Sequence, residues 1–379
     1  MTSRILSGDA DFWRSRRTGV KWGLYAADVL PLWVAEMDAA PCDPVVAAVA
    51  AAMRRGDTGY PLGRSFVEAA VSYAARTWSW TVPASRAMPV ADVMTGLSEV
   101  VRVVTDPGGP VVVSSPVYNA FFDHLDLVDR RVVDAPLTDA GRLDLDLLDR
   151  TFGEVRARGE RAAYLLCNPQ NPTGTVHTRD ELTALAALAE THDVVVISDE
   201  IHAPIVHDGP FVPYLSVPGG SRGVALVSAS KAWNLAGLKA AVVVIGEDAR
   251  PDVALHEVLT HGSGHLGQVA AIAAWGEGEA WLRQLTGEVA ENAALLGRLL
   301  AQRIPAIGYA APASTYLAWL DCRALGLGDD PAAVFRERGR VAFSSGPSFG
   351  ERGRGFTRVN LATSPEILEE AVTRMENAL

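Results

Sequence analysis

The chain has 379 residues, of which 49% are hydrophobic, and a formal net charge of −11. This apolar content excludes a disordered protein and suffices for a large buried core, and the length predicts two domains. The acidic balance argues against a nucleic-acid-binding protein, because binding phosphates requires a basic face.

The three cysteines, Cys42, Cys167 and Cys322, are odd in number and have the spacing of neither a zinc site nor a disulfide framework. We therefore expect buried thiols in a reducing compartment and no metal. The N-terminus has no apolar core of signal-peptide length, and the other apolar runs are too short to cross a membrane. The prediction is a cytoplasmic protein with neither a membrane nor a nucleic acid as its partner.

The middle of the chain alternates short apolar runs with helical patterns. The runs read as strands are residues 110–115, 162–167, 193–198, 224–228 and 240–245. Each is rich in β-branched or other apolar residues and is followed by polar residues, Gly or Pro. Because their apolar character is continuous, both faces should be buried, which is typical of a largely parallel sheet covered by helices in an α/β fold.

One connecting helix is well marked. Thr178 and Glu181 form a plausible capping box, and Leu182 and Leu185 begin an apolar stripe at helical spacing. The helix should end near His192, where the next strand begins at once. This unit predicts a right-handed crossover between parallel strands.

The pattern changes after about residue 275. A long amphipathic helix is expected over 281–303 and a final helix over 365–378. Strand-like segments lie between them, at residues 315–320, 341–344 and 357–361. Helices mixed with a few separate strands predict a smaller α+β domain. The first 45 residues have little periodicity and should join that domain or wrap the surface.

Two of the polar segments at strand ends suggest covalent cofactor chemistry. Lys231 follows a predicted strand, and a partly desolvated lysine forms imines readily. Asp199 ends another strand, where a carboxylate can pair with a protonated pyridine nitrogen. Taken alone, Lys231 would more often be a solvated surface group and Asp199 a loop or capping residue.

Two further segments fit the same ligand. Asn168–Gly174 forms a rigid turn, from which the Asn171 amide can donate to a phenolic oxygen. Residues 95–98 read as a glycine turn that opens a helix and offers N–H groups to an anion. A bare turn and ordinary helix capping explain these two segments equally well in isolation.

Together, and in this order, the segments resemble fold-type I enzymes of the class I/II aminotransferase superfamily, which use pyridoxal 5′-phosphate (PLP). The resemblance is strongest to cystathionine β-lyase-like C–S lyases of the MalY/PatB type. It is carried by the stretches at residues 21–22, 31–38, 58–61, 115–122, 167–174, 198–206, 228–239, 315–323 and 358–364. It implies a large PLP-binding domain over 46–275 with a mostly parallel seven-stranded sheet, and a small α+β domain over 276–379. Residues 1–45 would join the small domain.

The resemblance also implies a role for each matching residue. Lys231 would hold PLP as a Schiff base and move protons at Cα, Asp199 would pair with the ring nitrogen, and Tyr118 would stack on the ring. The other implied contacts are Asn171 and His202 at the ring hydroxyl, Gly96, Leu97, Ser98, Ser228, Ser230 and Lys239 around the phosphate, and Arg358, Trp33 and Asn171 at the substrate. Tyr60 would reach the neighbouring subunit's site, which implies a homodimer and makes Tyr60 catalytic together with Lys231 and Tyr118.

The implied activity is β-cleavage of cystathionine or another cysteine S-conjugate to a thiol, pyruvate and ammonia. An aminotransferase is the alternative, since it uses the same residues up to the carbanion. A related side-chain transformation in secondary metabolism and a non-catalytic PLP-binding regulator are further alternatives. Lys239 departs from many aminotransferases, which have Arg there. The segment from His256 to His261 has one residue too many for a zinc-binding HExxH motif.

Overall fold

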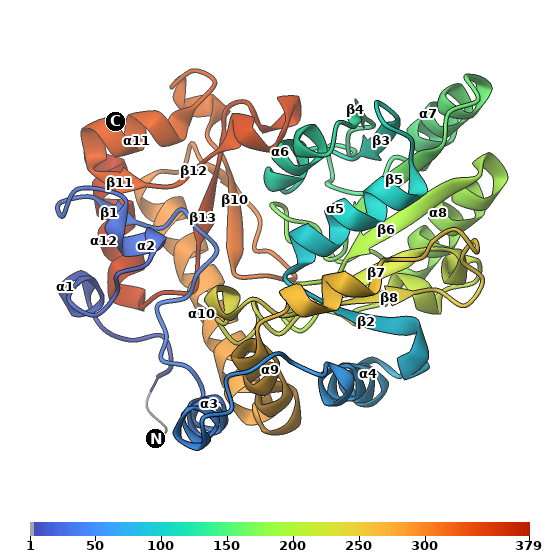
Figure 1. The fold of residues 1–379 in the computed structure, drawn as a ribbon. Coiled ribbons are helices and arrows are strands. Elements are labelled where there is room, and N and C mark those ends of the chain that lie inside the picture. Colours follow the sequence, from blue (N-terminus) through green and yellow to red (C-terminus); the bar gives the residue numbers. More distant parts are fainter. Residues whose placement is uncertain (1–3) are drawn as a thin grey trace.

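The computed structural model describes residues 4–379, and its centre is a seven-stranded sheet (Figure 1). Its order is β2-β8-β7-β6-β5-β3-β4. The strands are β2 (Ala87–Val90), β3 (Pro110–Val113), β4 (Arg131–Asp134), β5 (Ala162–Cys167), β6 (Val194–Asp199), β7 (Val224–Val227) and β8 (Ala241–Ile245). Strand β8 runs opposite to the other six strands of this sheet, so its pairs with β2 and β7 are antiparallel and the remaining pairs are parallel. The expected mostly parallel, seven-stranded sheet is confirmed.

Helices cover both faces of this sheet, as β5 illustrates. Ala163, Leu165 and Cys167 pack in one apolar cluster with helix α5 (Val93–Val104), whereas the alternate residues Ala162, Tyr164 and Leu166 pack in the other. Every residue of β5 is therefore buried, which explains its continuous apolar sequence. The other helices of this part are α3 (Asp43–Arg55), α4 (Arg64–Trp78), α6 (Ala120–Leu127), α7 (Leu145–Ala157), α8 (Arg179–His192) and α9 (His265–Glu277). Helix α8 has the predicted capping box of Thr178 and Glu181.

The C-terminal part forms a second sheet in the order β12-β13-β10-β9, with antiparallel pairing throughout. Its strands are β9 (Gly308–Tyr309), β10 (Leu317–Asp321), β12 (Ser344–Ser345) and β13 (Phe356–Asn360), and its helices are α10 (Glu279–Arg303), α11 (Pro331–Gly339) and α12 (Pro365–Asn377). Strand β10 begins two residues later than predicted, because Thr315 has a left-handed φ of 66°.

The N-terminal segment lies against this second part (Figure 1). Two short helices, α1 (Ala10–Arg14) and α2 (Val20–Gly23), precede strand β1 (Leu30–Pro31). Strand β1 pairs in parallel with β11 (Val341–Ala342). This pairing supports our proposal that the N-terminal segment joins the C-terminal part, while the division into residues 1–45, 46–275 and 276–379 stays a prediction.

Helix α5 begins earlier than the sequence suggested. Its N-cap is Asp92, whose side chain accepts a hydrogen bond from the amide of Thr95, so Gly96 lies inside the helix. A Cβ on Gly96 would lie 2.8 Å from Val90 Cγ2 and 3.0 Å from Leu226 Cδ2. The prediction that a glycine turn opens this helix is therefore wrong: the glycine allows close packing of helix on sheet.

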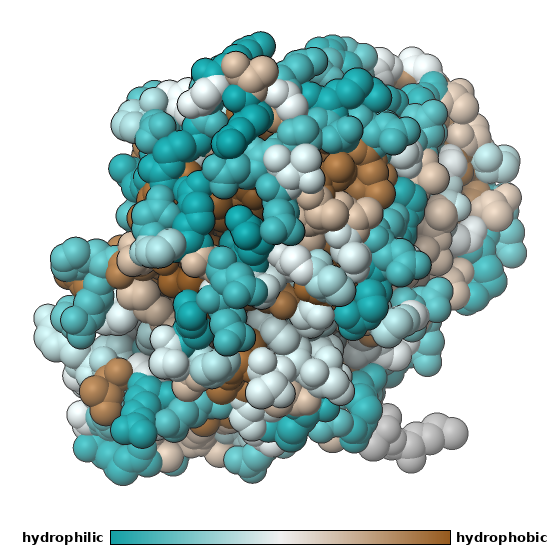
Figure 2. Space-filling model, turned by 90° about the vertical axis from the view of Figure 1, so that its right-hand side faces the viewer, coloured by the Kyte–Doolittle hydropathy of each residue, from teal (hydrophilic) through white to brown (hydrophobic). Residues whose placement is uncertain are grey.

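All three cysteines are buried and unpaired. Among residues 4–379, no helix combines the length and apolar character that crossing a membrane requires. Hydrophilic residues cover most of the face shown in Figure 2, and hydrophobic ones lie between them in scattered groups.

Candidate active site

Four polar side chains gather where parallel strands of the large sheet end. Asp199 is the last residue of β6, and Lys231 lies in the turn after β7. Asn171 follows β5, and Tyr118 follows β3. Because β3, β5, β6 and β7 are successive parallel neighbours, their carboxyl ends meet at one edge of the sheet, where α/β folds bind ligands.

Residues 33–37, called the strap below, supply backbone acceptors to this edge. The carbonyl of Ala35 accepts hydrogen bonds from Lys231 Nζ and from the Tyr316 hydroxyl, each at 3.0 Å. The carbonyl of Trp33 accepts one from Arg358 Nη2 at 3.2 Å. The strap therefore orients the amine and the guanidinium of the site through its main chain.

The remaining strap carbonyls are also occupied. Asn360 Nδ2 donates to the carbonyls of Val34 and Glu36, at 2.8 and 2.6 Å, and Asn234 Nδ2 donates to that of Met37 at 3.0 Å. Five consecutive carbonyls thus accept bonds from side chains that come from distant parts of the sequence. Such bonds fix a segment that has no regular secondary structure.

A buried ion pair anchors the strap to helix α2. Lys21 Nζ lies 2.8 Å from Asp38 Oδ2, and the two side chains are 2% and 1% exposed. The other Asp38 oxygen accepts a bond from Trp22 Nε1 at 2.8 Å, and Lys21 also donates to the carbonyl of Glu36 at 3.1 Å. The sequence stretches at 21–22 and 31–38 are therefore joined in one structural unit.

Arg358 connects the expected substrate and cofactor contacts. It is buried on β13, and its Nη1 donates to Asn171 Oδ1 at 3.0 Å. Because this oxygen is taken, the NH₂ group of Asn171 remains as the donor for a ring hydroxyl. The Asn171 backbone amide donates to Cys167 Sγ at 3.3 Å, which fixes the loop behind the site.

Burial and nearby charges shift the pKa values of Lys231 and Asp199. Burial, followed by the nearby Arg358 charge, lowers the pKa of Lys231 to about 8. A sizeable fraction of its amine is therefore neutral near physiological pH, as a nucleophile or base requires. Burial raises the pKa of Asp199 to about 6, although the Ile201 amide and Lys231 oppose the rise. Asp199 stays mostly ionised at neutral pH and is suited to pair with a cationic ring nitrogen.

His202 and Tyr118 carry no charge at neutral pH. Burial, then Lys231 and Arg358, holds the pKa of His202 well below its ordinary value. Burial likewise raises the pKa of Tyr118, although Arg358 opposes this. His202 Nδ1 and Arg358 Nε are buried without a hydrogen-bond partner in the described structure, so each is available to a bound ligand.

The structure shifts the expected phosphate cradle by one turn of helix α5. The Gly96 amide donates to the carbonyl of Asp92, the Leu97 side chain lies in the core, and Ser98 Oγ donates to the carbonyl of Met94. Val93 and Met94 occupy the first two helical positions, whose amides have no intrahelical acceptor. The phosphate-binding amides in our proposal are therefore those of Val93 and Met94.

The other residues expected around the phosphate lie close to one another. Ser228 Oγ is 3.0 Å from Ser230 Oγ and 2.7 Å from the carbonyl of Ala240, next to Lys239. Lys239 Nζ is 2.9 Å from Asp92 Oδ2 at the start of helix α5. A helix N-terminus, a lysine and serine hydroxyls are the groups that a phosphate ester requires.

Trp33 contacts Arg358 through its backbone, whereas Tyr60 forms no hydrogen bond or ring contact with the other predicted site residues in the described part of the chain. The Trp33 ring contacts Tyr25 edge-on, with centroids 5.8 Å apart. Tyr60 is 91% exposed and lies 6.4 Å, ring to ring, from His261 of its own chain. Its reach into a neighbouring subunit's site stays a prediction.

The residues present fit PLP. The Asp199 carboxylate, the Asn171 amide and the Tyr118 ring suit a pyridine ring that carries a hydroxyl. The amine of Lys231 suits the aldehyde. The buried, unpartnered His202 Nδ1 and Arg358 Nε give the site further polar atoms for a ligand to satisfy.

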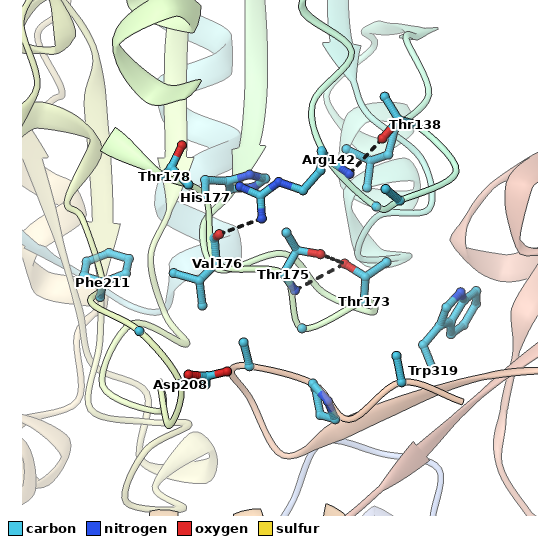
Figure 3. A pocket seen from close by; sticks show the side chains of 18 of the residues that line it. Thr138, Arg142, Thr173, Thr175, Val176, His177, Thr178, Asp208, Phe211 and Trp319 are labelled. Atoms are coloured by element: carbon cyan, nitrogen blue, oxygen red, sulfur yellow. Dashed lines mark hydrogen bonds between the residues drawn. The ribbon is translucent and has the colours of Figure 1, made fainter. Parts of the chain in front are cut away.

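A separate cavity of about 1230 Å³ lies between the 173–179 loop and residues 310–313 (Figure 3). Its lining, as far as the chain is described, includes none of the predicted site residues. Three of its arginines are paired with carboxylates: Arg142 with Glu181, Arg323 with Asp321 and Arg352 with Asp139. The fourth lining arginine, Arg179, donates to the carbonyl of Ser216, and we assign the cavity no ligand.

Comparisons with known proteins agree with this geometry. A family model described as aminotransferase class I and II matches residues 28–375. The chain is 47% identical to a putative cystathionine beta-lyase of Mycobacterium tuberculosis, over 97% of this chain and 96% of that one. It is 32% identical to a cystathionine beta-lyase of Corynebacterium glutamicum, over 97% and 98%. The solved structure of a putative PLP-dependent beta-cystathionase from Corynebacterium diphtheriae has a TM-score of 0.90 and 33% identity, covering 99% of this chain and 98% of that one.

Sequence reasoning missed three parts of the site. Tyr316 lay within a recognised stretch, but nothing in its pattern indicated a contact with Ala35. The strap carbonyls have no side-chain signature at all. Asp92 did carry a signal, since an Asp directly before an apolar-periodic segment is a typical N-cap.

Proposed function

Because the chain belongs to the class I and II aminotransferase family and its cofactor is PLP, we propose that it is a C–S β-lyase. The substrate would be cystathionine or another cysteine S-conjugate. The observation that carries the proposal is the near-full-length similarity to proteins named cystathionine beta-lyase, in a chain whose site has Lys231, Asp199, Asn171 and Arg358 in place.

The described residues divide the work as follows. Arg358 binds the α-carboxylate of the substrate, and its bond to Asn171 keeps it aligned with the ring position. Lys231 would take the proton from Cα, with the Ala35 carbonyl as the neighbouring acceptor for its amine. PLP, when bound, supplies the electron sink for this deprotonation, and Asp199 strengthens that sink at the ring nitrogen.

Cleavage then follows from the electron pair left at Cα. The Cα–Cβ double bond forms as the Cβ–S bond breaks, and the thiolate leaves and takes up a proton. Tyr118 keeps its own proton, because burial raises its pKa, and can serve as a donor at this stage. Water then hydrolyses the aminoacrylate to pyruvate and ammonia, which balances the reaction.

An aminotransferase is the second candidate, and a specific observation favours it. A solved structure described as a PLP-bound putative aminotransferase from Clostridium difficile has a TM-score of 0.88 and 27% identity, covering 96% of this chain and 97% of that one. A transaminase would use the same residues for deprotonation and then return a proton to the cofactor instead of expelling a thiolate.

A paired assay separates the two. Purified enzyme is given cystathionine, and pyruvate and thiol are measured. In parallel it is given the same amino donor with a 2-oxo acid, and the new amino acid is measured. We expect pyruvate and thiol in equal amounts. Amination of the 2-oxo acid without thiol release would contradict the lyase proposal.

Homodimerisation and a cytoplasmic location complete the proposal. The support for the dimer is the 57–63 segment, in which Tyr60 and Leu62 are 91% and 92% exposed on a single chain. Bulky apolar side chains that stand this far out are typical of a surface that another chain covers. Sedimentation should give twice the mass of the chain, and Tyr60→Phe should lower activity without loss of the dimer.

A further inference from the structure

The phosphate end of the site contains a carboxylate that no part of the proposed reaction uses. Asp92 is the N-cap of helix α5, directly before the Val93 and Met94 amides to which we assign the phosphate. Its Oδ1 accepts from the Thr95 amide at 2.8 Å, and its Oδ2 pairs with Lys239 Nζ at 2.9 Å. An acid therefore occupies the two cationic features, helix terminus and lysine, that would otherwise serve the phosphate alone.

Asp92 carries its charge at neutral pH. Burial opposes ionisation, but the hydrogen bonds from Lys239 and from the Thr95 amide hold the pKa of Asp92 below its ordinary value. Its side chain is 30% exposed, so its field is only partly screened by solvent. The pair of Asp92 and Lys239 is close to neutral as a whole, which leaves the helix terminus as the main net attraction for an anion.

We propose that Asp92 limits the affinity of this enzyme for the phosphate group of PLP, by repelling that anion and by sharing Lys239 with it. This inference rests on the proposed PLP site. Capping alone does not require a charge, because Asn and Ser cap helices about as well as Asp. The charge at this position is therefore an additional property of the site, and it disfavours a second anion nearby.

The test uses Asp92→Asn, which keeps a side-chain oxygen for the Thr95 amide and removes only the charge. Cofactor-free protein is titrated with PLP and, separately, with pyridoxal, which lacks the phosphate. Binding is followed by the absorption of the bound cofactor and by protein fluorescence. We expect Asp92→Asn to tighten PLP binding on the order of tenfold at low salt and to leave pyridoxal binding unchanged. The gain should shrink as ionic strength rises.

Asp144→Asn is the matched control. Asp144 is the N-cap of α7 and accepts from the Leu147 amide at 2.9 Å, so it has the same capping role in a helix outside the proposed site. It should change neither affinity. Asp92→Ser also keeps a capping oxygen and should tighten PLP binding as Asp92→Asn does. Agreement between the two variants would exclude a folding defect of one variant as the cause.

The outcomes distinguish the inference from the proposal on which it rests. If the PLP-to-pyridoxal affinity ratio is unchanged or falls in both Asp92 variants, the role of Asp92 is refuted while the PLP site stands. If the unmodified protein binds neither PLP nor pyridoxal, the proposed function and the inference fail together.

Discussion

Breaking the buried pair of Lys21 and Asp38 by removing one partner should cost far more stability than breaking an exposed pair of similar geometry. Replacing Lys21 with Met fills much of the same volume and leaves the Asp38 carboxylate buried, with Trp22 Nε1 as its remaining donor. Removing one partner of a buried ion pair typically costs about 3–5 kcal/mol, because the other charge is left uncompensated. We expect a loss of this size in the free energy of unfolding for Lys21→Met, measured by urea denaturation with circular dichroism.

Two further variants make this test specific. Arg131→Met breaks a pair with a similar N–O distance, 2.9 Å to Glu160, but with side chains that are 42% and 32% exposed. It should cost about 1 kcal/mol or less. Lys21→Met combined with Asp38→Asn removes both charges and should be more stable than Lys21→Met alone. The reasoning is refuted if Lys21→Met costs no more than Arg131→Met, or if the double variant is the less stable one.

Three more predictions concern the site itself. Burial, followed by the Arg358 charge, lowers the pKa of Lys231 to about 8. Arg358→Met removes the second of these causes, so the pH at which PLP is captured half-maximally should rise; an unchanged or lower midpoint would contradict this. Tyr316→Phe removes one of the two side-chain donors to the Ala35 carbonyl. It should lower kcat with little change in KM and cost about 1 kcal/mol of stability. Steady-state kinetics that show only a change in KM would argue against a role of Tyr316 in holding Lys231. Gly96→Ala forces a Cβ to within 3.0 Å of three core side chains and should destabilise the protein by about 1–3 kcal/mol in thermal unfolding. An unchanged midpoint of unfolding would mean that the helix moves freely.

The sequence predicted the large sheet well because its strands are buried on both faces. Continuous apolar runs such as 162–167 and 224–228 are assigned easily because they have no polar face, and the Thr178–Glu181 capping box marked its helix correctly. The start of α5 was placed too late because Gly96 looked like a turn. A glycine that permits close packing and one that permits a turn look alike in a sequence, and only the neighbours in space separate them.

The candidate site could be predicted from the sequence only where side chains, and not backbone atoms, form it. Lys231, Asp199 and Asn171 lie at one edge of the sheet, as parallel strands require. Their functional roles remain predictions. The backbone acceptors of the strap could not be predicted from the sequence, because every residue has a carbonyl. Only the three-dimensional path of the chain decides which carbonyls contact Lys231 and Arg358.

The strap also bears on how such an enzyme could change its substrate. Its carbonyls hold Lys231 and Arg358 through main-chain atoms, so the identity of the side chains at positions 33–37 does not enter those bonds. Trp33, which is partly exposed, is therefore free to vary in size while the chemistry behind it stays aligned. Glu36 is less free, because its charge raises the pKa of Lys231. Random substitution at position 33 should yield variants with altered substrate preference and intact proton transfer, which makes this end of the strap a natural starting point for directed evolution.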